Sequence, residues 1–384
     1  MDVTYVLPIG CGEAHHGHDE LFGLLRDLAA SAEVVVVDNS EATVFGDHHA
    51  ALGSPIRHLR PAPGLRTANG KVGNVLTGVR AARHERVVIA DDDVRHDART
   101  LGDLAARLDH ADVVVPSNVF EPAPWHARWD TARSLLNRSF WIDFPGTLAV
   151  RRSTLLAIGG YDGDVLFENL ELLRTVEAAG GRVVSASEIF VPRRPPSVRG
   201  FLSQRVRQAY DDLAQPWKLG TMLAIAPVTW WAVSRRRWSA LAAGVGASIA
   251  LAEIGRRRAG GARIYGPTAA VWAPAWLAER AVCSWIAVAD RVLFGGIRYR
   301  GTRLRRAATP PRELRARLGA RRQRGGSGTA RGRERAAAWD PSQTGLFFER
   351  PHRQSAITSR RRHSSSPSSS TSVTGPRTRN GPSR

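Results

Sequence analysis

The chain has 384 residues, a formal net charge of +20 and two cysteines. Its length allows two or three domains with a sizeable core and excludes a small protein that depends on disulfides. Cys11 and Cys283 cannot form a disulfide framework, and no CxxC pair suggests a zinc site, so a reducing compartment is favoured. The first residues lack a positive leader and a long apolar stretch, and we expect no secretory signal ahead of the fold.

The positive charge is concentrated towards the C-terminus. Residues 1–212 carry 23 basic and 28 acidic side chains, residues 213–300 carry 12 and 3, and residues 301–384 carry 20 and 4. An acidic N-terminal portion without a basic stripe argues against a domain that reads a nucleic-acid groove. We therefore do not expect nucleic acid as a partner.

Residues 1–212 alternate between short β-branched runs and longer polar segments with apolar residues at helical spacing. Such runs are typical of strands buried on both faces of a mainly parallel sheet. The alternation predicts an α/β, doubly wound domain whose ligands bind beyond the carboxyl ends of the strands. The predicted strands are Val3–Leu7, Val34–Val37, Val87–Ala90 and Val113–Val115, and the predicted helices are Glu20–Ala30, Val72–Arg83 and Ala98–Leu108.

Residues 213–300 contain apolar blocks of Ala, Trp, Leu and Val separated by arginine clusters. Crossing a bilayer takes roughly 20 apolar residues, and tryptophans gather near the block ends, where indole rings favour the lipid–water boundary. We expect membrane-embedded or interfacial helices, with an Ala-rich helical bundle in water as the alternative. The number of crossings stays open, because Arg235–Arg237 and Arg256–Arg258 flank the same block. The blocks are Leu219–Val233, Trp238–Ile254 and Tyr265–Phe294.

Residues 301–384 are rich in Arg, Ser, Gly and Pro. A segment of this composition cannot bury enough apolar surface to fold, so we expect a disordered basic tail. Its first arginine clusters, Arg303–Arg306 and Arg315–Arg324, follow the apolar blocks directly. They are placed either to contact anionic lipid or to act as a solvated linker.

Three consecutive carboxylates follow the predicted strand Val87–Ala90. Repulsion between Asp91, Asp92 and Asp93 is relieved by a cation, and hard oxygen ligands suit Mg²⁺ or Mn²⁺. A divalent cation that bridges a diphosphate is the simplest hypothesis. The alternative is a solvated acidic turn that caps the next helix.

Two further polar positions accompany this acidic strand end. Asp38 follows the strand Val34–Val37 and could bond a ribose or base, or form a capping Asx turn. Lys71 lies in a glycine-containing loop that opens a helix, and it is one of two lysines among 55 basic residues. A compact ammonium at a helix start suits a phosphate, although a surface lysine needs no special explanation.

Together these motifs resemble family 2 glycosyltransferases, which have the GT-A fold, over about residues 2–212. The resemblance implies that a nucleotide sugar contacts Pro8, Asp38, Lys71, Asp91 and Asp92, and that Asp91 and Asp93 form the metal-binding DxD motif. The spacing of Lys71, Asn74 and Gly78 is similar to the ceramide glucosyltransferase branch. Further matches are Arg151, Gly159–Tyr161, the acidic segment Phe167–Leu172 and the QxxRW-like Gln204–Gln208, in which Gln204, Arg207 and Gln208 would contact acceptor or diphosphate.

The sequence departs from the family pattern at two positions. Asn169 stands where the family carries its catalytic aspartate, and an amide has no basic lone pair. Glu168 and Glu171 are the alternative general bases, or else an acidic pair that favours the helix start. Gln208 replaces the tryptophan of the family motif, which removes an aromatic surface for a sugar.

The resemblance implies an inverting glycosyltransferase that uses a divalent cation and a nucleotide-diphosphate sugar, expected to be UDP-linked. The acceptor would be a lipid or a lipid-linked glycan or polysaccharide, because the Gln204–Gln208 segment precedes the apolar blocks. We expect a membrane protein with its catalytic domain on the cytoplasmic face. The rival hypothesis is a non-catalytic membrane protein that binds a nucleotide sugar or a partner.

Overall fold

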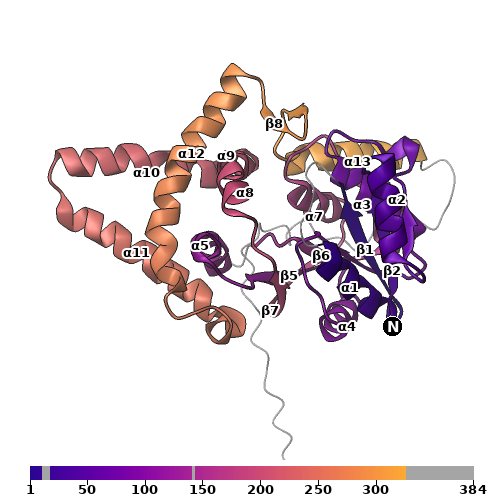
Figure 1. The fold of residues 1–384 in the computed structure, drawn as a ribbon. Helices are drawn as coiled ribbons and strands as arrows, with labels where there is room; N and C mark the ends of the chain where they lie inside the picture. The colour runs from indigo at the N-terminus through magenta and orange to yellow at the C-terminus, as the bar shows by residue number, and fades with distance from the viewer. Residues whose placement is uncertain (11–17, 141–142, 326–384) are drawn as a thin grey trace, which may run out of the picture. The chain divides into compact units, whose positions relative to one another are not determined.

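A computed structural model of the protein describes residues 1–10, 18–140 and 143–325. Its centre is a seven-stranded sheet with the strand order β3-β2-β1-β4-β6-β5-β7 (Figure 1). β6 runs antiparallel to its neighbours β4 and β5, and the remaining pairs are parallel. The predicted α/β fold with a mainly parallel sheet is confirmed. The strands are β1 (Val3–Ile9), β2 (Glu33–Asp38), β3 (Arg57–Leu59), β4 (Arg86–Ala90), β5 (Val113–Phe120), β6 (Thr147–Arg151) and β7 (Val183–Arg193).

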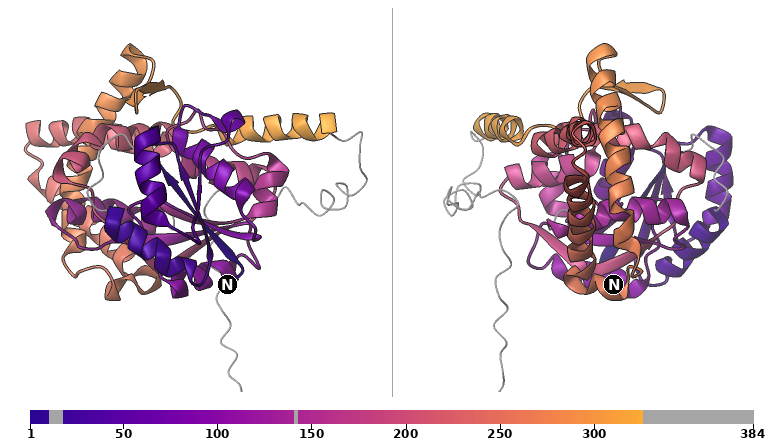
Figure 2. Two further views of the ribbon diagram at one scale, coloured as in Figure 1. Left: turned by 45° about the vertical axis from the view of Figure 1, so that its right-hand side comes forward. Right: turned by 90° about the vertical axis from the view of Figure 1, so that its left-hand side faces the viewer.

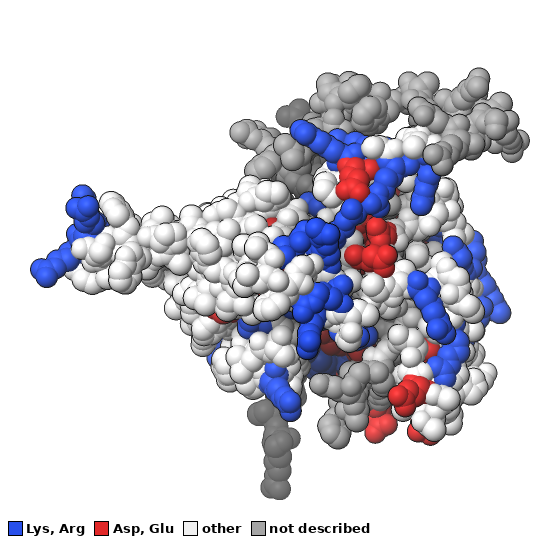
Figure 3. Space-filling view, turned by 90° about the horizontal axis from the view of Figure 1, so that it is seen from above, with Lys and Arg blue, Asp and Glu red and all other residues white. Residues whose placement is uncertain are grey.

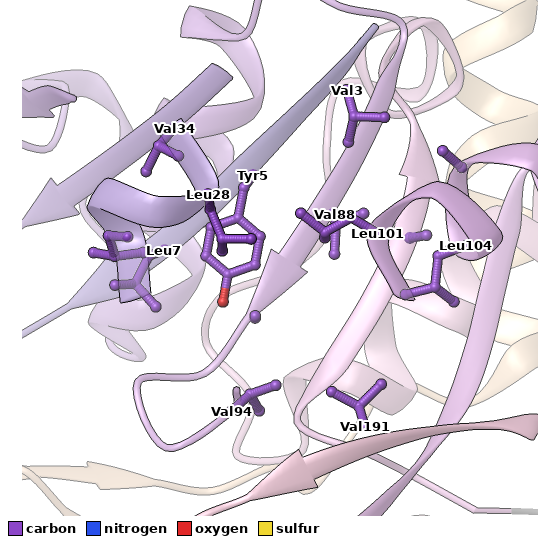
Figure 4. Packing of buried hydrophobic residues seen from close by; sticks show 14 of the residues in the cluster. Val3, Tyr5, Leu7, Leu28, Val34, Val88, Val94, Leu101, Leu104 and Val191 are labelled. Atoms are coloured by element: carbon purple, nitrogen blue, oxygen red, sulfur yellow. The ribbon is translucent and has the colours of Figure 1, made fainter. Parts of the chain in front are cut away.

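Helices cover both faces of the sheet because successive strand residues point to opposite sides. Tyr5 and Leu7 belong to a cluster with residues of α1 and α4, whereas Val6 belongs to a second cluster with residues of α3, α6 and α7. Figure 4 shows side chains of the first cluster, among them Tyr5, Leu28 and Val88. These helices are α1 (His18–Ala29), α2 (Ala42–Leu52), α3 (Gly70–Ala81), α4 (Ala98–Arg107), α5 (Trp125–Ser139), α6 (Arg152–Ile158) and α7 (Glu168–Ala178).

A second, helical layer follows the sheet in the chain and packs on α5. Gly255 of α11 approaches the backbone of α5 so closely that an added Cβ would lie 1.8 Å from the carbonyl oxygen of Leu135. The helices of this layer are α8 (Val198–Ser203), α9 (Arg205–Tyr210), α10 (Pro216–Ser234), α11 (Trp238–Arg257) and α12 (Ala273–Leu293). Short 3-10 turns lie at Pro63–Leu65, Asp211–Ala214, Arg258–Arg263 and Ala269–Trp272.

We call α10 and α11 with their connecting loop the helical arm, because they extend away from the sheet (Figures 1 and 2). Seen from above, the arm is largely free of charged side chains except at its far end (Figure 3). Within the described residues, one helical segment, Trp238–Arg263, is long and apolar enough to cross a membrane, and only 17% of its most apolar window is buried.

The expected disorder of residues 301–384 is wrong for residues 302–325. β8 (Ile297–Tyr299) and β9 (Thr302–Leu304) form an antiparallel hairpin, and α13 (Pro311–Gly325) follows it. The arginine-rich composition did not indicate that this segment contains a few buried apolar residues. They are Leu304, Ala307, Ala308 and Leu314. Ala307 also accepts a backbone hydrogen bond from Phe167 N at 2.8 Å, so the segment is fixed to the start of α7. Residues 326–384 lie outside the described part of the chain.

Candidate active site

The acidic strand end lies where β4 meets β6. Asp91 N donates a 2.8 Å hydrogen bond to the carbonyl oxygen of Gly146. A Cβ added at Gly146 would lie 2.6 Å from Asp91 Oδ2, so the Asp91 carboxylate needs a glycine at this position. The tight contact fixes the first carboxylate of the DxD motif at the carboxyl end of the sheet.

Lys71 joins this carboxylate to α7. Its Nζ lies 2.5 Å from Asp91 Oδ1 and 2.6 Å from Glu168 Oε1. Asn69, whose side chain also caps α3, has its amide nitrogen 3.4 Å from Glu168 Oε2. Burial opposes a charged ammonium, but the carboxylates of Asp91 and Glu168 outweigh it and hold the pKa of Lys71 well above its ordinary value. The structure therefore brings together three of the residues that the sequence singled out.

Arg193, at the end of β7, is a site residue that the sequence did not reveal. Its Nε lies 2.8 Å from Asp93 Oδ2 and its Nη2 4.0 Å from Asp91 Oδ2, so one guanidinium faces both carboxylates. An isolated bridge between Val94 and Arg193 holds the two segments together. Burial raises the pKa of Asp93 to about 6, with Arg193 opposing the rise and the charges of Asp91 and Asp92 adding to it.

Asp92 and Pro8, two further residues predicted to contact the donor, lie near the same strand ends. Asp92 is partly exposed, and its backbone carbonyl oxygen accepts a 2.8 Å hydrogen bond from Arg95 Nη1. Pro8 is buried within β1, paired in register with Val37. Both lie near the carboxyl end of the sheet, and a direct contact of either with a nucleotide sugar stays a prediction.

Asp38 is fully buried at the end of β2. Its side chain has no exposed surface, and it accepts hydrogen bonds from Ser40 N at 2.8 Å, His48 Nδ1 at 2.7 Å and His58 Nε2 at 3.2 Å. Burial would raise the pKa of Asp38, but the hydrogen bonds from His58, Ser40 and His48 hold it well below its ordinary value. The hydrogen bond from Ser40 N matches the Asx-turn alternative, and a contact of Asp38 with a nucleoside stays a prediction.

The two candidate bases occupy different surroundings. Glu168 lies beside Lys71, with 16% of its side chain exposed. Glu171 has no exposed surface, and its Oε2 accepts a 2.6 Å hydrogen bond from Thr309 N, on the segment before α13. Burial raises the pKa of Glu171. The structure does not bring Glu171 to the acidic strand end, because its side chain points beneath the C-terminal segment. Asn169 donates from Nδ2 to the Pro145 carbonyl oxygen at 2.9 Å, next to Gly146.

Gln204 and Arg207 line a pocket of about 760 Å³ between α8, α9, α12 and the β8–β9 hairpin. The Arg207 guanidinium carbon lies 5.3 Å from the centre of the Tyr299 ring. Gln208 follows on α9, and its Oε1 is buried without a hydrogen-bond partner among the described residues. The hairpin also reaches the strand ends, because a Cβ at Gly10 would lie 3.1 Å from Arg300 Nη1. Sequence reasoning singled out the arginines of this segment but did not predict a hairpin.

The residues at the acidic strand end fit a divalent cation that shares its ligands with a diphosphate. Within the described residues, no group of three or more His, Cys, Asp or Glu side chains forms a complete metal site. Asp93 Oδ1 is buried and no hydrogen-bond donor of the described chain reaches it. Mg²⁺-type ions in transferases are commonly held by one or two carboxylates, with the other ligands from substrate phosphates and water.

The doubly wound sheet, the carboxylates beyond β4 and the ammonium at the start of α3 are features of a nucleotide-sugar transferase of the GT-A type. The family model described as glycosyl transferase family 2 matches residues 24–163. This match lies within the part of the chain whose motifs resemble that family. No curated protein matches the chain significantly.

Solved structures show distant likenesses. A mannosyltransferase from Pyrobaculum calidifontis, in complex with GDP-Man and Mn²⁺, is 20% identical, with coverage of 77% of this chain and 87% of that one and a TM-score of 0.44. Glucosyl-3-phosphoglycerate synthase from Mycobacterium tuberculosis, in complex with Mn²⁺, UDP and glucosyl-3-phosphoglycerate, is 17% identical over 56% and 78%, with a TM-score of 0.38. Mannosyl-3-phosphoglycerate synthase from Rubrobacter xylanophilus is 15% identical over 53% and 69%, with a TM-score of 0.36.

Proposed function

We propose that this protein is a membrane-associated, inverting glycosyltransferase that moves a sugar from a UDP-linked donor to a hydroxyl of a lipid or lipid-linked glycan. One observation carries the proposal. The Lys71 ammonium lies between Asp91, at the strand end where donors bind in such folds, and Glu168, the candidate base. Lys71 would thus contact both the residue that binds the donor and the residue that activates the acceptor.

The reaction follows from these positions. The acceptor hydroxyl attacks the anomeric carbon of the donor sugar, and the bond from that carbon to the diphosphate oxygen breaks. Glu168 takes the hydroxyl proton, while Lys71 exchanges its carboxylate contacts for the departing nucleoside diphosphate. A divalent cation held by Asp91 and Asp93 would neutralise charge on that diphosphate. Attack on the face opposite the leaving group inverts the anomeric centre.

The helical layer supports membrane association. Among the 19 residues of α10, only Met222 and Ala232 are buried, while large apolar side chains such as Trp230, at 75%, are exposed. Contiguous apolar surface of this extent is typical of a membrane or protein contact. We assign residues 1–212 to the catalytic domain and residues 213–300 to membrane-embedded or interfacial helices. The catalytic domain is assigned to the cytoplasmic face, in keeping with a reducing compartment.

The test uses purified membranes that contain the full chain, a panel of nucleotide sugars and detection of released nucleoside diphosphate. Glu168→Gln should lower turnover by about 10² to 10⁴ with little change in donor affinity, the usual cost of losing a general base. Glu177→Gln is the matched control, because Glu177 lies exposed on the same helix.

Two results would overturn parts of the proposal. If Glu168→Gln retains full turnover, Glu168 is not the base. If the unaltered protein binds a donor but transfers no sugar from any of them, it is a nucleotide-sugar-binding protein instead.

A further inference from the structure

We propose that the pocket between α9, α12 and the β8–β9 hairpin binds the phosphate group and the first part of the apolar chain of a phosphorylated lipid. This inference rests on the proposed function, because it defines the acceptor as a lipid that carries a phosphate between its apolar chain and its sugar-accepting end. The pocket of about 760 Å³ is large enough for a phosphate with several carbon atoms of its chain.

The lining of this pocket is strongly basic. The lining contains four arginines and one carboxylate, that of Asp290. Within the described residues, Arg207, Arg298 and Arg300 have no carboxylate within salt-bridge distance. On the face that Figure 3 shows, basic side chains likewise outnumber acidic ones where the arm meets the rest of the molecule. Guanidinium groups gathered around a concave surface suit the oxygens of a phosphate, to which they donate paired hydrogen bonds.

The same pocket also has an apolar side. Ile286 and Phe294 line it, and they are 44% and 60% exposed. Val282, 58% exposed, lies four residues before Ile286, so it occupies the same face of α12. From Val282 to Phe294 this stripe spans about 18 Å at 1.5 Å per residue. An apolar chain bound at the arginines could lie along the stripe and continue into the bilayer.

Tyr299 lines the pocket, and the charges of Glu168 and Lys71 act on its hydroxyl. Burial, together with Glu168, raises the pKa of Tyr299. The hairpin also touches the loop before α3, where Thr302 Oγ1 lies 3.5 Å from the carbonyl oxygen of Ala68. A phosphate at the arginines would therefore place the polar end of the lipid towards Glu168.

The experiment measures binding by titration calorimetry with the full chain in alkyl maltoside micelles. The probes are dihexanoyl phosphatidate, which carries both chemical features, dihexanoyl phosphatidylcholine, and inorganic phosphate. We expect phosphatidate to bind at least about tenfold more tightly than either of the others. The double variant Arg298→Gln, Arg300→Gln should weaken phosphatidate binding by about tenfold or more.

The matched control is Arg235→Gln, Arg236→Gln, which removes two exposed arginines from the loop between α10 and α11. A second variant, Ile286→Asn, should weaken binding of phosphatidate and leave that of inorganic phosphate unchanged. Thermal unfolding of every variant shows whether a loss of binding reflects a loss of fold.

Three outcomes would overturn the inference. Equal affinity for inorganic phosphate and phosphatidate would make the ligand a free phosphate. Equal losses in the control and pocket variants would show a non-specific charge effect, and an unchanged affinity in the pocket variants would place the ligand elsewhere. Nucleotide-sugar binding, measured on the same samples, separates this inference from the proposed function, because donor binding and transfer can persist when phosphatidate does not bind.

Discussion

The sheet and the helical arm contain similar apolar residues in opposite surroundings. All seven residues of β1 are buried, whereas α10 buries two of its 19. Burial of apolar surface stabilises a fold by roughly 25 cal/mol per Å², so the side chains of β1 stabilise the protein through contacts within the chain. Those of α10 have few such contacts. The difference shows that apolar composition identifies residues that avoid water, but it does not show whether protein or lipid surrounds them.

The largest effect is expected at the acidic strand end. Asp91→Asn should abolish divalent-dependent donor binding, because it removes both a metal ligand and the negative charge that faces Lys71. Donor affinity measured with Mn²⁺ and with a chelator tests this, and Asp103→Asn, at an exposed position of α4, is the control. Identical donor affinity with and without chelator in the unaltered protein would contradict a metal role for this strand end.

The contrast between the core and the arm predicts that replacing an apolar side chain by alanine lowers the free energy of unfolding much more in the core than in the arm. Leu104→Ala in the buried core should lower the free energy of unfolding by about 2–5 kcal/mol. Val228→Ala on the exposed face of α10 should change it by less than about 0.5 kcal/mol in detergent. Thermal unfolding in detergent gives both values. A large cost for Val228→Ala would mean that protein, and not lipid, covers the arm.

Asp38→Asn should destabilise the fold by about 2–3 kcal/mol at pH 7, because the carboxylate accepts hydrogen bonds inside the protein. The folded-state pKa of Asp38 is lowered, so its contribution is complete above pH 4 and is lost as the pH falls towards the folded-state value. The difference in stability between the two proteins should therefore shrink in acid. A difference that stays constant down to pH 3 would show that the charge of Asp38 is not what stabilises the turn.

The smallest effect is expected for Glu171→Gln. Burial raises the pKa of Glu171. Ionising Glu171 in the folded protein therefore lowers the free energy of unfolding, and this loss develops as the pH rises through the folded-state pKa. An amide can still accept the hydrogen bond from Thr309 N without that cost, so the variant should gain about 1 kcal/mol or less relative to the unaltered protein as the pH rises. Its turnover should be unchanged. A loss of turnover comparable to that of Glu168→Gln would restore Glu171 as a candidate base.

The sequence predicts the sheet well because its strands are local patterns. Val34–Val37 and Val87–Ala90 are short β-branched runs ended by Asp, and the structure extends each by only one or two residues. Lys71 and the acidic run were likewise visible, because each marks the junction of a strand or helix with a loop. Whether Lys71 and the acidic run lie close together depends on the order of the strands in the sheet. The alternation of strands and helices predicted a doubly wound sheet but not this order.

Features that depend on distant contacts escaped prediction. Arg193 meets Asp93 across 100 residues of sequence, and the residue types alone do not pair them. Asp38 appears in the sequence as an acidic residue at a strand end without a partner. In the structure its carboxylate pairs with histidines from α2 and β3. The β8–β9 hairpin was not predicted, because its two strands have three residues each, bury few side chains and show no periodic pattern among the arginines.

The Lys71 bridge has a thermodynamic consequence. The ammonium contacts the Asp91 carboxylate that we propose as a metal ligand, so a metal ion that arrives alone must compete with an internal counter-ion. A diphosphate offers that ammonium a new partner, which makes the displacement less costly. Metal and donor thus each improve the affinity of the protein for the other, and by reciprocity the coupling free energy is the same whichever binds first.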